Sequence, residues 1–373
     1  MKGIGNKKKL VVKLGTSTLT GGSNKLNRAS MLEIVRAIRS LVTNGWQVAV
    51  VSSGAIAAGR ELLGYPDLPS QMCYKQMLSA AGQGKLFEIW EDLFSIYNLH
   101  IGQLLLTKAD LENRERYLNA RDTLSAMLDY GVIPIINEND AVAVSEIKVG
   151  DNDNLAALIG VLIEADEVIL LTDQKGLYTS DPRKDPKATL ISTVEHIDEK
   201  IVALCGGSGT TLGTGGMATK VAAAKIATDA GVKLVIAEGS NPAQLPALAE
   251  GTGLGTTFLP SKHPVLSRKS WLSSATIAQG RVLVDAGAEN ALLHKGSSLL
   301  PKGIKSVEGN FSRGATVDIV SLDGRNIARG ITRYSSDDLK RISGKHSHEI
   351  EEILGFMHGA EAVHRDDLAL CKI

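Results

Sequence analysis

The chain has 373 residues, of which 43% are hydrophobic and 22% are charged, and its formal net charge at pH 7 is zero. This composition is ordinary for a soluble globular protein of about two domains, and no apolar stretch approaches the roughly 20 residues of a membrane-spanning helix. The 3 cysteines are widely spaced and form no CxxC pair, which argues against a disulfide framework. The apolar run after the basic N-terminus is too short for a signal peptide, so we expect a cytoplasmic protein.

Residues 1 to about 260 alternate between apolar segments of strand length and segments with helical spacing. Asn27 is expected to cap a helix that ends at Asn44-Gly45, and a charged helix is expected from Arg114 to Tyr130. The expected strands cover residues 10–14, 48–51, 101–106, 132–136, 168–171 and 234–237. Strands that are apolar along their whole length and alternate with helices predict an α/β fold, in which helices sandwich a mostly parallel sheet.

Polar motifs stand at the ends of four of these strands. They are Thr16-Ser17, Ser52-Ser53-Gly54, Asn137-Glu138-Asn139-Asp140 and Thr172-Asp173. Sheets of this kind bind ligands at the carboxyl ends of their strands. We therefore expect these motifs to meet at one binding edge.

Two lysines stand in segments suited to face phosphate. Lys13 ends an apolar run that leads into Gly15-Thr16-Ser17, and Lys220 follows a glycine-rich loop, Gly213 to Thr219, that leads into a helix starting near Met217. Glycines let backbone N–H groups approach phosphate oxygens, and a helix N-terminus adds positive potential. The spacing is not that of a Walker A loop. Taken singly, the loop also fits a surface loop and Lys13 also fits a lysine that reaches solvent, but their combination favours a phosphate site.

Between the two lysines lies Gly150-Asp151-Asn152-Asp153-Asn154, at the start of an expected helix. One of these side chains can cap the helix, which leaves the others in need of another role. Asp153 is expected either to orient the two lysines or to approach a phosphate-bound Mg²⁺. Asn152 and the Asn139-Asp140 pair are candidates for binding the amine or carboxylate of a small polar substrate. No residue stands out as a general base, which fits an acceptor carboxylate that is already ionised.

Taken together, these motifs resemble those of the amino acid kinase family, and the resemblance runs from Leu10 to about Asp367. It rests on 11–17, 52–60, 136–140, 148–154, 171–178 and the loop that ends at Lys220. Within the family, the chain is most similar to members that transfer the γ-phosphate of ATP to the γ-carboxylate of L-glutamate, the first step of proline biosynthesis. The resemblance implies ATP and Mg²⁺ as cofactors and assigns no residue as a direct metal ligand.

The resemblance also implies roles for individual residues. Lys13 and Lys220 would stabilise the transferring phosphoryl group and Asp153 would organise them. Glutamate would be bound by Ser53, Asp140 and Asn152, with Asn137 nearby. ATP would be bound by Lys13, Thr172, Asp173, Thr214, Gly215, Gly216, Met217, Ala218, Thr219 and Lys220.

Regulation and assembly are implied by the same resemblance. Proline is expected to inhibit by competing around the glutamate site, and Lys148 and the region of Asp110 are our candidates for where this control is felt. A homo-oligomer, either a dimer or a tetramer, is expected.

The pattern changes after Pro260. We expect a kinase domain over 1–260, a linker over 261–278, a small β-rich domain over 279–357 and a tail over 358–373, with a short helix from His348 and irregular chain after it. Asp323-Gly324 predicts a hairpin, and a helix is expected from Ser336 to Ser343. Segments 296–304 and 309–314 resemble a PUA domain.

The charge of this C-terminal region keeps a nucleic-acid hypothesis open. From Lys262 to Lys345 there are 14 Lys and Arg against 7 Asp and Glu. RNA is nevertheless an unlikely partner on this pattern, because the candidate stacking aromatics are few, namely Phe311 and Tyr334.

Two alternatives to the leading function remain. One is an amino acid kinase that acts on another substrate, such as N-acetylglutamate or aspartate, and the other is an RNA-binding protein with a kinase-like scaffold.

Overall fold

A computed structural model describes residues 7–143, 151–205, 216–261 and 278–371. The chain divides into two compact units, one made of Met1–Glu112 and Ala120–Pro264 and the other of Asn113–Asn119 and Val265–Ile373. Within the described ranges, no helix combines the length and apolar character needed to cross a membrane.

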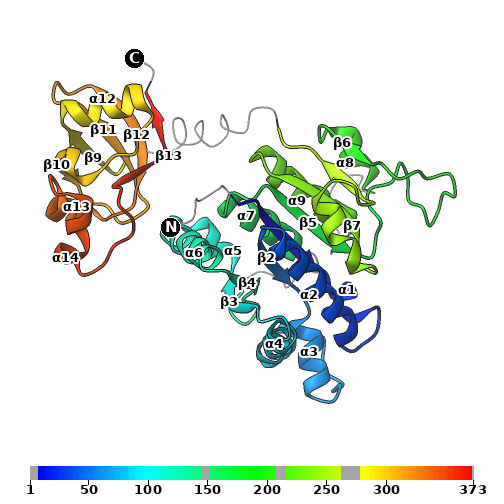
Figure 1. Ribbon diagram of the computed structural model, residues 1–373. Coiled ribbons are helices and arrows are strands. Elements are labelled where there is room, and N and C mark those ends of the chain that lie inside the picture. The colour runs from blue at the N-terminus through cyan, green and yellow to red at the C-terminus, as the bar shows by residue number, and fades with distance from the viewer. Residues whose placement is uncertain (1–6, 144–150, 206–215, 262–277, 372–373) are drawn as a thin grey trace. The chain divides into compact units, whose positions relative to one another are not determined.

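The first unit is built on an eight-stranded sheet with the strand order β3-β4-β2-β1-β5-β7-β8-β6 (Figure 1). Neighbouring strands are parallel except β7 and β8, which pair antiparallel. The strands are β1 (Lys9–Leu14), β2 (Gln47–Ser52), β3 (His100–Leu106), β4 (Val132–Glu138), β5 (Glu167–Thr172), β6 (Thr193–Val194), β7 (Lys233–Glu238) and β8 (Thr256–Phe258). The predicted mostly parallel sheet is therefore confirmed.

Helices cover this sheet on two sides. They are α1 (Thr16–Thr20), α2 (Arg28–Thr43), α3 (Ala55–Leu62), α4 (Met72–Ser95), α5 (Lys108–Glu112), α6 (Arg114–Asp129), α7 (Asp151–Leu162), α8 (Glu199–Leu204), α9 (Met217–Asp229) and α10 (Leu245–Ala249). Helices α2, α4 and α10 share one hydrophobic core with alternate residues of the central strands, such as Leu10, Val12 and Leu14. Because successive strand side chains point to opposite faces, Lys13 points to the other face. Helices α7 and α9 pack against each other there, and Figure 1 shows where the two helices lie.

The helix starts predicted from the sequence agree with the observed helices. The Asn27 side chain accepts a hydrogen bond from the backbone N–H of Ser30 at 3.1 Å and so caps α2. Helices α7 and α9 begin at Asp151 and Met217, where the sequence predicted helix starts.

A close crossing of α3 and α4 depends on two glycines. A Cβ atom at Gly59 would lie 2.0 Å from the carbonyl oxygen of Leu78, and one at Gly82 would lie 2.0 Å from the carbonyl oxygen of Ala55. Only a residue without a side chain fits there, because both neighbouring atoms belong to backbone. The crossing fixes α4 beside Gly54 and Ala55, the residues that follow strand β2.

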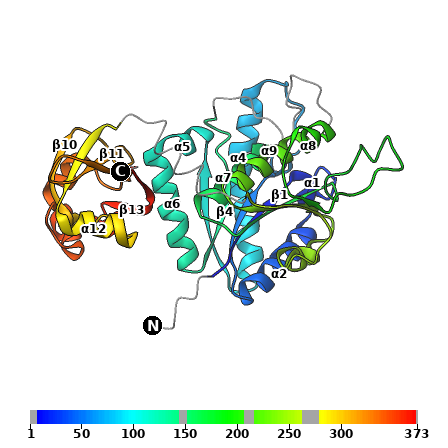
Figure 2. The ribbon, with the colours of Figure 1, turned by 90° about the horizontal axis from the view of Figure 1, so that it is seen from above.

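The second unit contains a five-stranded sheet with the order β10-β9-β11-β12-β13. Its elements are β9 (Gly280–Val284), α12 (Ala286–Lys295), β10 (Ile304–Gly309), β11 (Thr316–Val320), β12 (Asn326–Thr332), α13 (Ser336–Ile342), α14 (Ile350–Leu354) and β13 (Val363–Leu370). Figure 2 shows α12 beside the strands of this sheet, and its Leu292 joins the same core as Val282 and Val317. The predicted hairpin at Asp323-Gly324 connects β11 to β12.

One expectation for this region is wrong, and one helix was not predicted. The chain after the short helix is not irregular, because Val363–Leu370 forms β13 at the edge of the sheet and pairs with β12. The charged run from His364 to Asp367 interrupts the apolar alternation that would have revealed the strand. Helix α12 was not predicted either, although Asp285 caps its start and Gly296, with a φ of 58°, ends it. The predicted linker falls almost wholly on 262–277, outside the described residues.

We predict that Gly82→Ala lowers the free energy of unfolding by more than about 2 kcal/mol, because the new methyl group forces α3 and α4 apart. Chemical denaturation measures the change. Gly84→Ala is the matched control on the same helix, since a Cβ there meets nothing within 4 Å, and it should stabilise the protein by about 0.5 kcal/mol. Equal effects of the two substitutions would contradict the crossing described here.

Candidate active site

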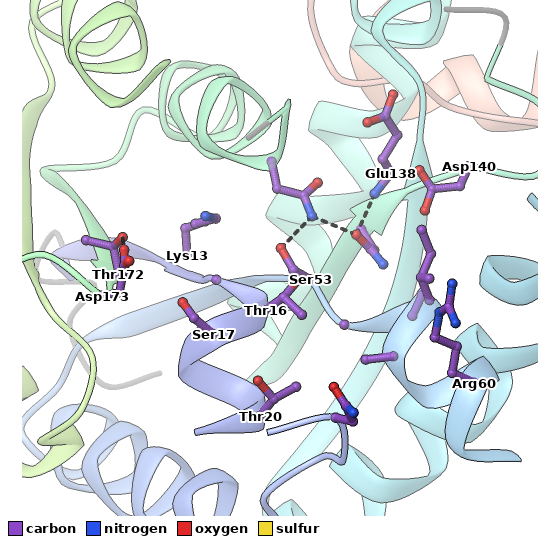
Figure 3. Close-up of a pocket in the computed structure, with 18 of the residues that line it drawn as sticks. Lys13, Thr16, Ser17, Thr20, Ser53, Arg60, Glu138, Asp140, Thr172 and Asp173 are labelled. Atoms are coloured by element: carbon purple, nitrogen blue, oxygen red, sulfur yellow. Dashed lines mark hydrogen bonds between the residues drawn. The ribbon is translucent and has the colours of Figure 1, made fainter. Parts of the chain in front are cut away.

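The carboxyl ends of the parallel strands surround a cavity of about 770 Å³. In Figure 3, Lys13, Thr172 and Asp173 lie toward one end, Asp140 and Arg60 toward the other, and Ser53 between them. The residues that line it are Lys13, Gly15, Thr16, Ser17, Thr20, Ser23, Asn24, Ser53, Gly54, Ala55, Ile56, Ala57, Arg60, Tyr65, Asn137, Glu138, Asp140, Asn152, Thr172, Asp173 and Lys220. All four polar motifs predicted to meet at one edge contribute to this lining.

A buried carboxylate shared by two lysines lies at one end of the cavity. The Nζ atom of Lys13, from β1, lies 2.6 Å from Oδ1 of Asp153, and the Nζ atom of Lys220, from α9, lies 3.1 Å from Oδ2. Thr219 Oγ1 donates a third contact to Oδ2 at 3.1 Å. Asp153, at the start of α7, has no solvent exposure, and each lysine is only 5% exposed.

The charge state of this cluster follows from a competition between burial and pairing. Burial acts to raise the pKa of Asp153, but the ion pairs with Lys13 and Lys220 outweigh it, so the pKa is lowered. Burial lowers the pKa of Lys13, and nearby Lys220 adds to this effect while Asp153 opposes it. Both lysines are thus held close together by one ionised carboxylate.

Glu167 is a second buried carboxylate, and it pairs with a single lysine. Its Oε2 atom lies 2.8 Å from Nζ of Lys233, and its side chain is 1% exposed. Burial raises the pKa of Glu167 to about 7, although the ion pair with Lys233 acts to lower it. One partly exposed lysine therefore does not compensate for burial, whereas the two lysines around Asp153 do.

A network of neutral polar groups forms the wall between the two ends of the cavity. Asn152 Nδ2 donates to Ser53 Oγ and to Asn137 Oδ1, each at 3.0 Å (Figure 3). Beyond it, the Asp140 carboxylate accepts a hydrogen bond from Ser79 at 2.6 Å. The four predicted substrate-binding residues, Ser53, Asn137, Asp140 and Asn152, are thus brought together on the cavity wall.

The predicted nucleotide-binding residues fall into three groups. Thr172 and Asp173 line the cavity at the end of β5, and Thr172 Oγ1 donates to Asp173 Oδ1 at 2.9 Å. Gly216, Met217, Ala218 and Thr219 form the start of α9, and of this helix only Lys220 is among the lining residues. Thr214 and Gly215 lie outside the described residues, as does Lys148.

Sequence reasoning missed several lining residues. Thr20, Ser23 and Asn24 come from the end of α1 and the turn after it, and Arg60 and Tyr65 come from α3 and the turn that follows. Tyr65 has a φ of 58°, an uncommon conformation for a residue with a side chain. Arg60 ends the segment 52–60 that resembles the family but was given no role, and the other four carry no local motif, so the fold is what brings them to the cavity.

Comparison with known proteins places this geometry in a family. The sequence profile of the amino acid kinase family matches residues 8–238, which is more than half of the chain. The chain belongs to the amino acid kinase family. A profile of the PUA domain matches residues 280–354.

Individual relatives of this amino acid kinase agree with that assignment. The chain is 57% identical over 359 residues to proteins named glutamate 5-kinase in Escherichia fergusonii and Shigella flexneri, covering 96% of this chain and 98% of each relative. A glutamate 5-kinase of Cronobacter sakazakii is 56% identical over 365 residues, covering 98% of this chain and 99% of the relative. A solved structure of carbamate kinase from Giardia lamblia bound to AMP-PNP superposes with a TM-score of 0.50 at 18% identity, covering 69% of this chain and 99% of that one. That structure supports the fold alone.

We predict that Asp153→Asn lowers the free energy of unfolding by about 3 kcal/mol, because it leaves two buried ammonium groups without a counter-charge. Thermal or chemical denaturation measures the loss. Asp229→Asn is the matched control, since Asp229 pairs with Lys225 at 3.0 Å with both side chains more than half exposed. It should cost a small fraction of that amount. A comparable loss in both variants would show that burial of the Asp153 cluster is not what matters.

Proposed function

We propose that this amino acid kinase transfers the γ-phosphate of ATP to the γ-carboxylate of L-glutamate and forms L-glutamyl 5-phosphate, the first step of proline biosynthesis. The observation that carries the proposal is the pair of lysines held by one buried carboxylate beside the polar wall of Ser53 and Asn152. The high identity to named glutamate 5-kinases over nearly the full chain supports the same substrate.

Lys13 and Lys220 supply the positive charge that phosphoryl transfer to a carboxylate needs. Both the attacking carboxylate and the nucleotide are anionic, so the main barrier is charge repulsion and positioning. Lys13 and Lys220 place two positive charges at the transferring phosphoryl group, and Asp153 keeps the ammonium groups from separating. No general base is required, because a carboxylate with a pKa near 4.3 is already ionised at neutral pH.

ATP is assigned to the end of the cavity that contains Thr172 and Asp173, next to the start of α9. When bound, Mg²⁺ neutralises part of the charge on the β- and γ-phosphates. Both oxygens of the Asp153 carboxylate already face lysines, which favours the orienting role of Asp153 over a role as a metal ligand. The phosphates and water are then the natural ligands of the ion.

Glutamate is assigned to the opposite end of the cavity. Its γ-carboxylate would face Lys13 and Lys220, while Ser53, Asn137, Asn152 and Asp140 would hold the rest of the molecule. Proline, an amino acid of similar size, would inhibit by competing around this end. Asp110 remains a candidate for transmitting that control, and its carboxylate accepts hydrogen bonds from the backbone and hydroxyl of Thr107 at the start of α5. We further propose a dimer or tetramer as the working assembly.

The two candidate stacking aromatics do not favour the RNA-binding alternative. Phe311 and Tyr334, the candidates for stacking bases, are 4% and 0% exposed and belong to the core of the second unit. A role of the PUA domain in regulation or assembly therefore fits better.

The proposal is tested by incubating the protein with ATP, Mg²⁺, hydroxylamine and a panel of acceptors. We expect hydroxamate to form with L-glutamate and to fall when proline is added. Hydroxamate with N-acetylglutamate or aspartate but none with glutamate would keep the phosphoryl chemistry and overturn the substrate.

We predict that Lys220→Ala lowers kcat for glutamate by at least about 100-fold, because one of the two charges on the transferring phosphoryl group is lost. Lys225→Ala is the matched control and should retain kcat, because Lys225 lies about one and a half turns further along α9 and its side chain is exposed. The hydroxamate assay gives both values. A kcat for Lys220→Ala within a few-fold of the unsubstituted protein would refute the role given to Lys220.

A further inference from the structure

Helix α4 presents a row of hydrogen-bonding side chains to the strand ends at the cavity. Ser79 donates to Asp140 at 2.6 Å, Gln83 Oε1 accepts from Asn137 Nδ2 at 2.8 Å, and Trp90 Nε1 donates to Ser52 Oγ at 3.1 Å. Ser79 and Gln83 are four residues apart and so lie on one face of the helix. Neither Ser79 nor Gln83 lines the cavity, so their effect on a ligand is indirect.

The contact made by Gln83 determines how two amides are oriented. Asn137 Oδ1 accepts a hydrogen bond from the backbone N–H of Glu138 at 2.9 Å, which requires an oxygen at that position. The Asn137 NH₂ group therefore faces Gln83, which must present its own oxygen. Asn137 Oδ1 also accepts from Asn152, so Asn152 must turn its NH₂ group toward Asn137 and Ser53. Gln83 thus fixes the orientation of the Asn137 amide, and Asn137 in turn fixes the orientation of the Asn152 amide.

This orientation of the amide leaves Asn152 Oδ1 without a hydrogen-bond donor in the described chain. Asn152 Oδ1 is buried and accepts no hydrogen bond from any residue of the described chain. A buried acceptor without a partner costs free energy, which a ligand with an N–H donor recovers. Ser79 in turn holds the Asp140 carboxylate on the same wall of the cavity. Asn152 and Asp140 both line the cavity, and an amide beside an anionic carboxylate suits a cationic donor such as an ammonium group.

We propose that Gln83 and Ser79 are positioning residues through which helix α4 makes the site select an acceptor substrate that has a free α-ammonium group. Gln83 acts through Asn137 and Asn152, and Ser79 acts through Asp140. This inference rests on the proposed function, because it takes the amino acid to bind at this end of the cavity. It also gives a physical reason why an N-acetylated amino acid would be rejected, since acetylation removes the positive charge and two of the three N–H donors.

The test compares two ligands that differ only in the α-amine. Glutarate has both carboxylates of glutamate but no ammonium group, so it does not depend on Asn152 Oδ1 or on Asp140. In Gln83→Met, which removes the hydrogen-bonding group, we expect KM for L-glutamate to rise about tenfold. KM for ATP, kcat and the inhibition constant of glutarate should each stay within about threefold. Gln83→Glu keeps an acceptor for Asn137 and should restore much of the affinity.

Ser79→Ala gives an independent variant that nearly preserves volume, and it should show the same selective rise in KM for L-glutamate. Glu88→Gln, on an exposed part of α4, is the control that should change none of these constants. The proposal is overturned if the inhibition constant of glutarate rises in parallel with KM for glutamate, if KM for ATP rises equally, or if Gln83→Glu is as impaired as Gln83→Met. Failure of the proposed function is separate, because the unsubstituted protein would then form no hydroxamate with glutamate.

Discussion

The site depends on one electrostatic balance, in which a fully buried carboxylate is shared by two almost buried lysines. Removing these charges from water is unfavourable, and the short contacts of Asp153 with Lys13 and Lys220 compensate for it. Glu167, also buried but paired with a single lysine, has a pKa raised to about 7. Asp153, by contrast, pairs with two lysines and its pKa is lowered, so the same pairing holds two cations side by side.

The parallel sheet makes this balance possible because it brings distant segments to one edge. Lys13 comes from the central strand β1, while Asp153 and Lys220 come from α7 and α9, which pack against each other on the face toward which Lys13 points. The end of the cavity near Asp140 is built differently. There the α3–α4 crossing at Gly59 and Gly82 sets the distance between α4 and the residues after β2. Gln83, next to Gly82, is thereby placed to orient the amides on the cavity wall.

The cluster of Lys13, Asp153 and Lys220 could be predicted from sequence and the supporting contacts could not. Lys13, Asp153 and Lys220 each stand out because a charge follows an apolar strand or begins a helix, where burial alone would not tolerate it. Gln83 and Ser79 carry no such signal, since polar residues are ordinary on a long helix and their role arises only from the helix crossing. Strand β13 was missed because four charged or titratable residues from His364 to Asp367 hide its pattern, whereas the caps of α12 at Asp285 and Gly296 were a usable signal.

We propose that Lys13 and Lys220 act as one unit on the same phosphoryl group. The most direct measurement is a double-mutant cycle on kcat with Lys13→Met, Lys220→Met and the combined variant, with folding checked by circular dichroism. Two charges that are held by one carboxylate and act on one group should be coupled, so the loss of transition-state stabilisation in the double variant should be clearly smaller than the sum of the single losses. Losses that simply add would mean that the lysines work independently and would contradict their joint action on one phosphoryl group.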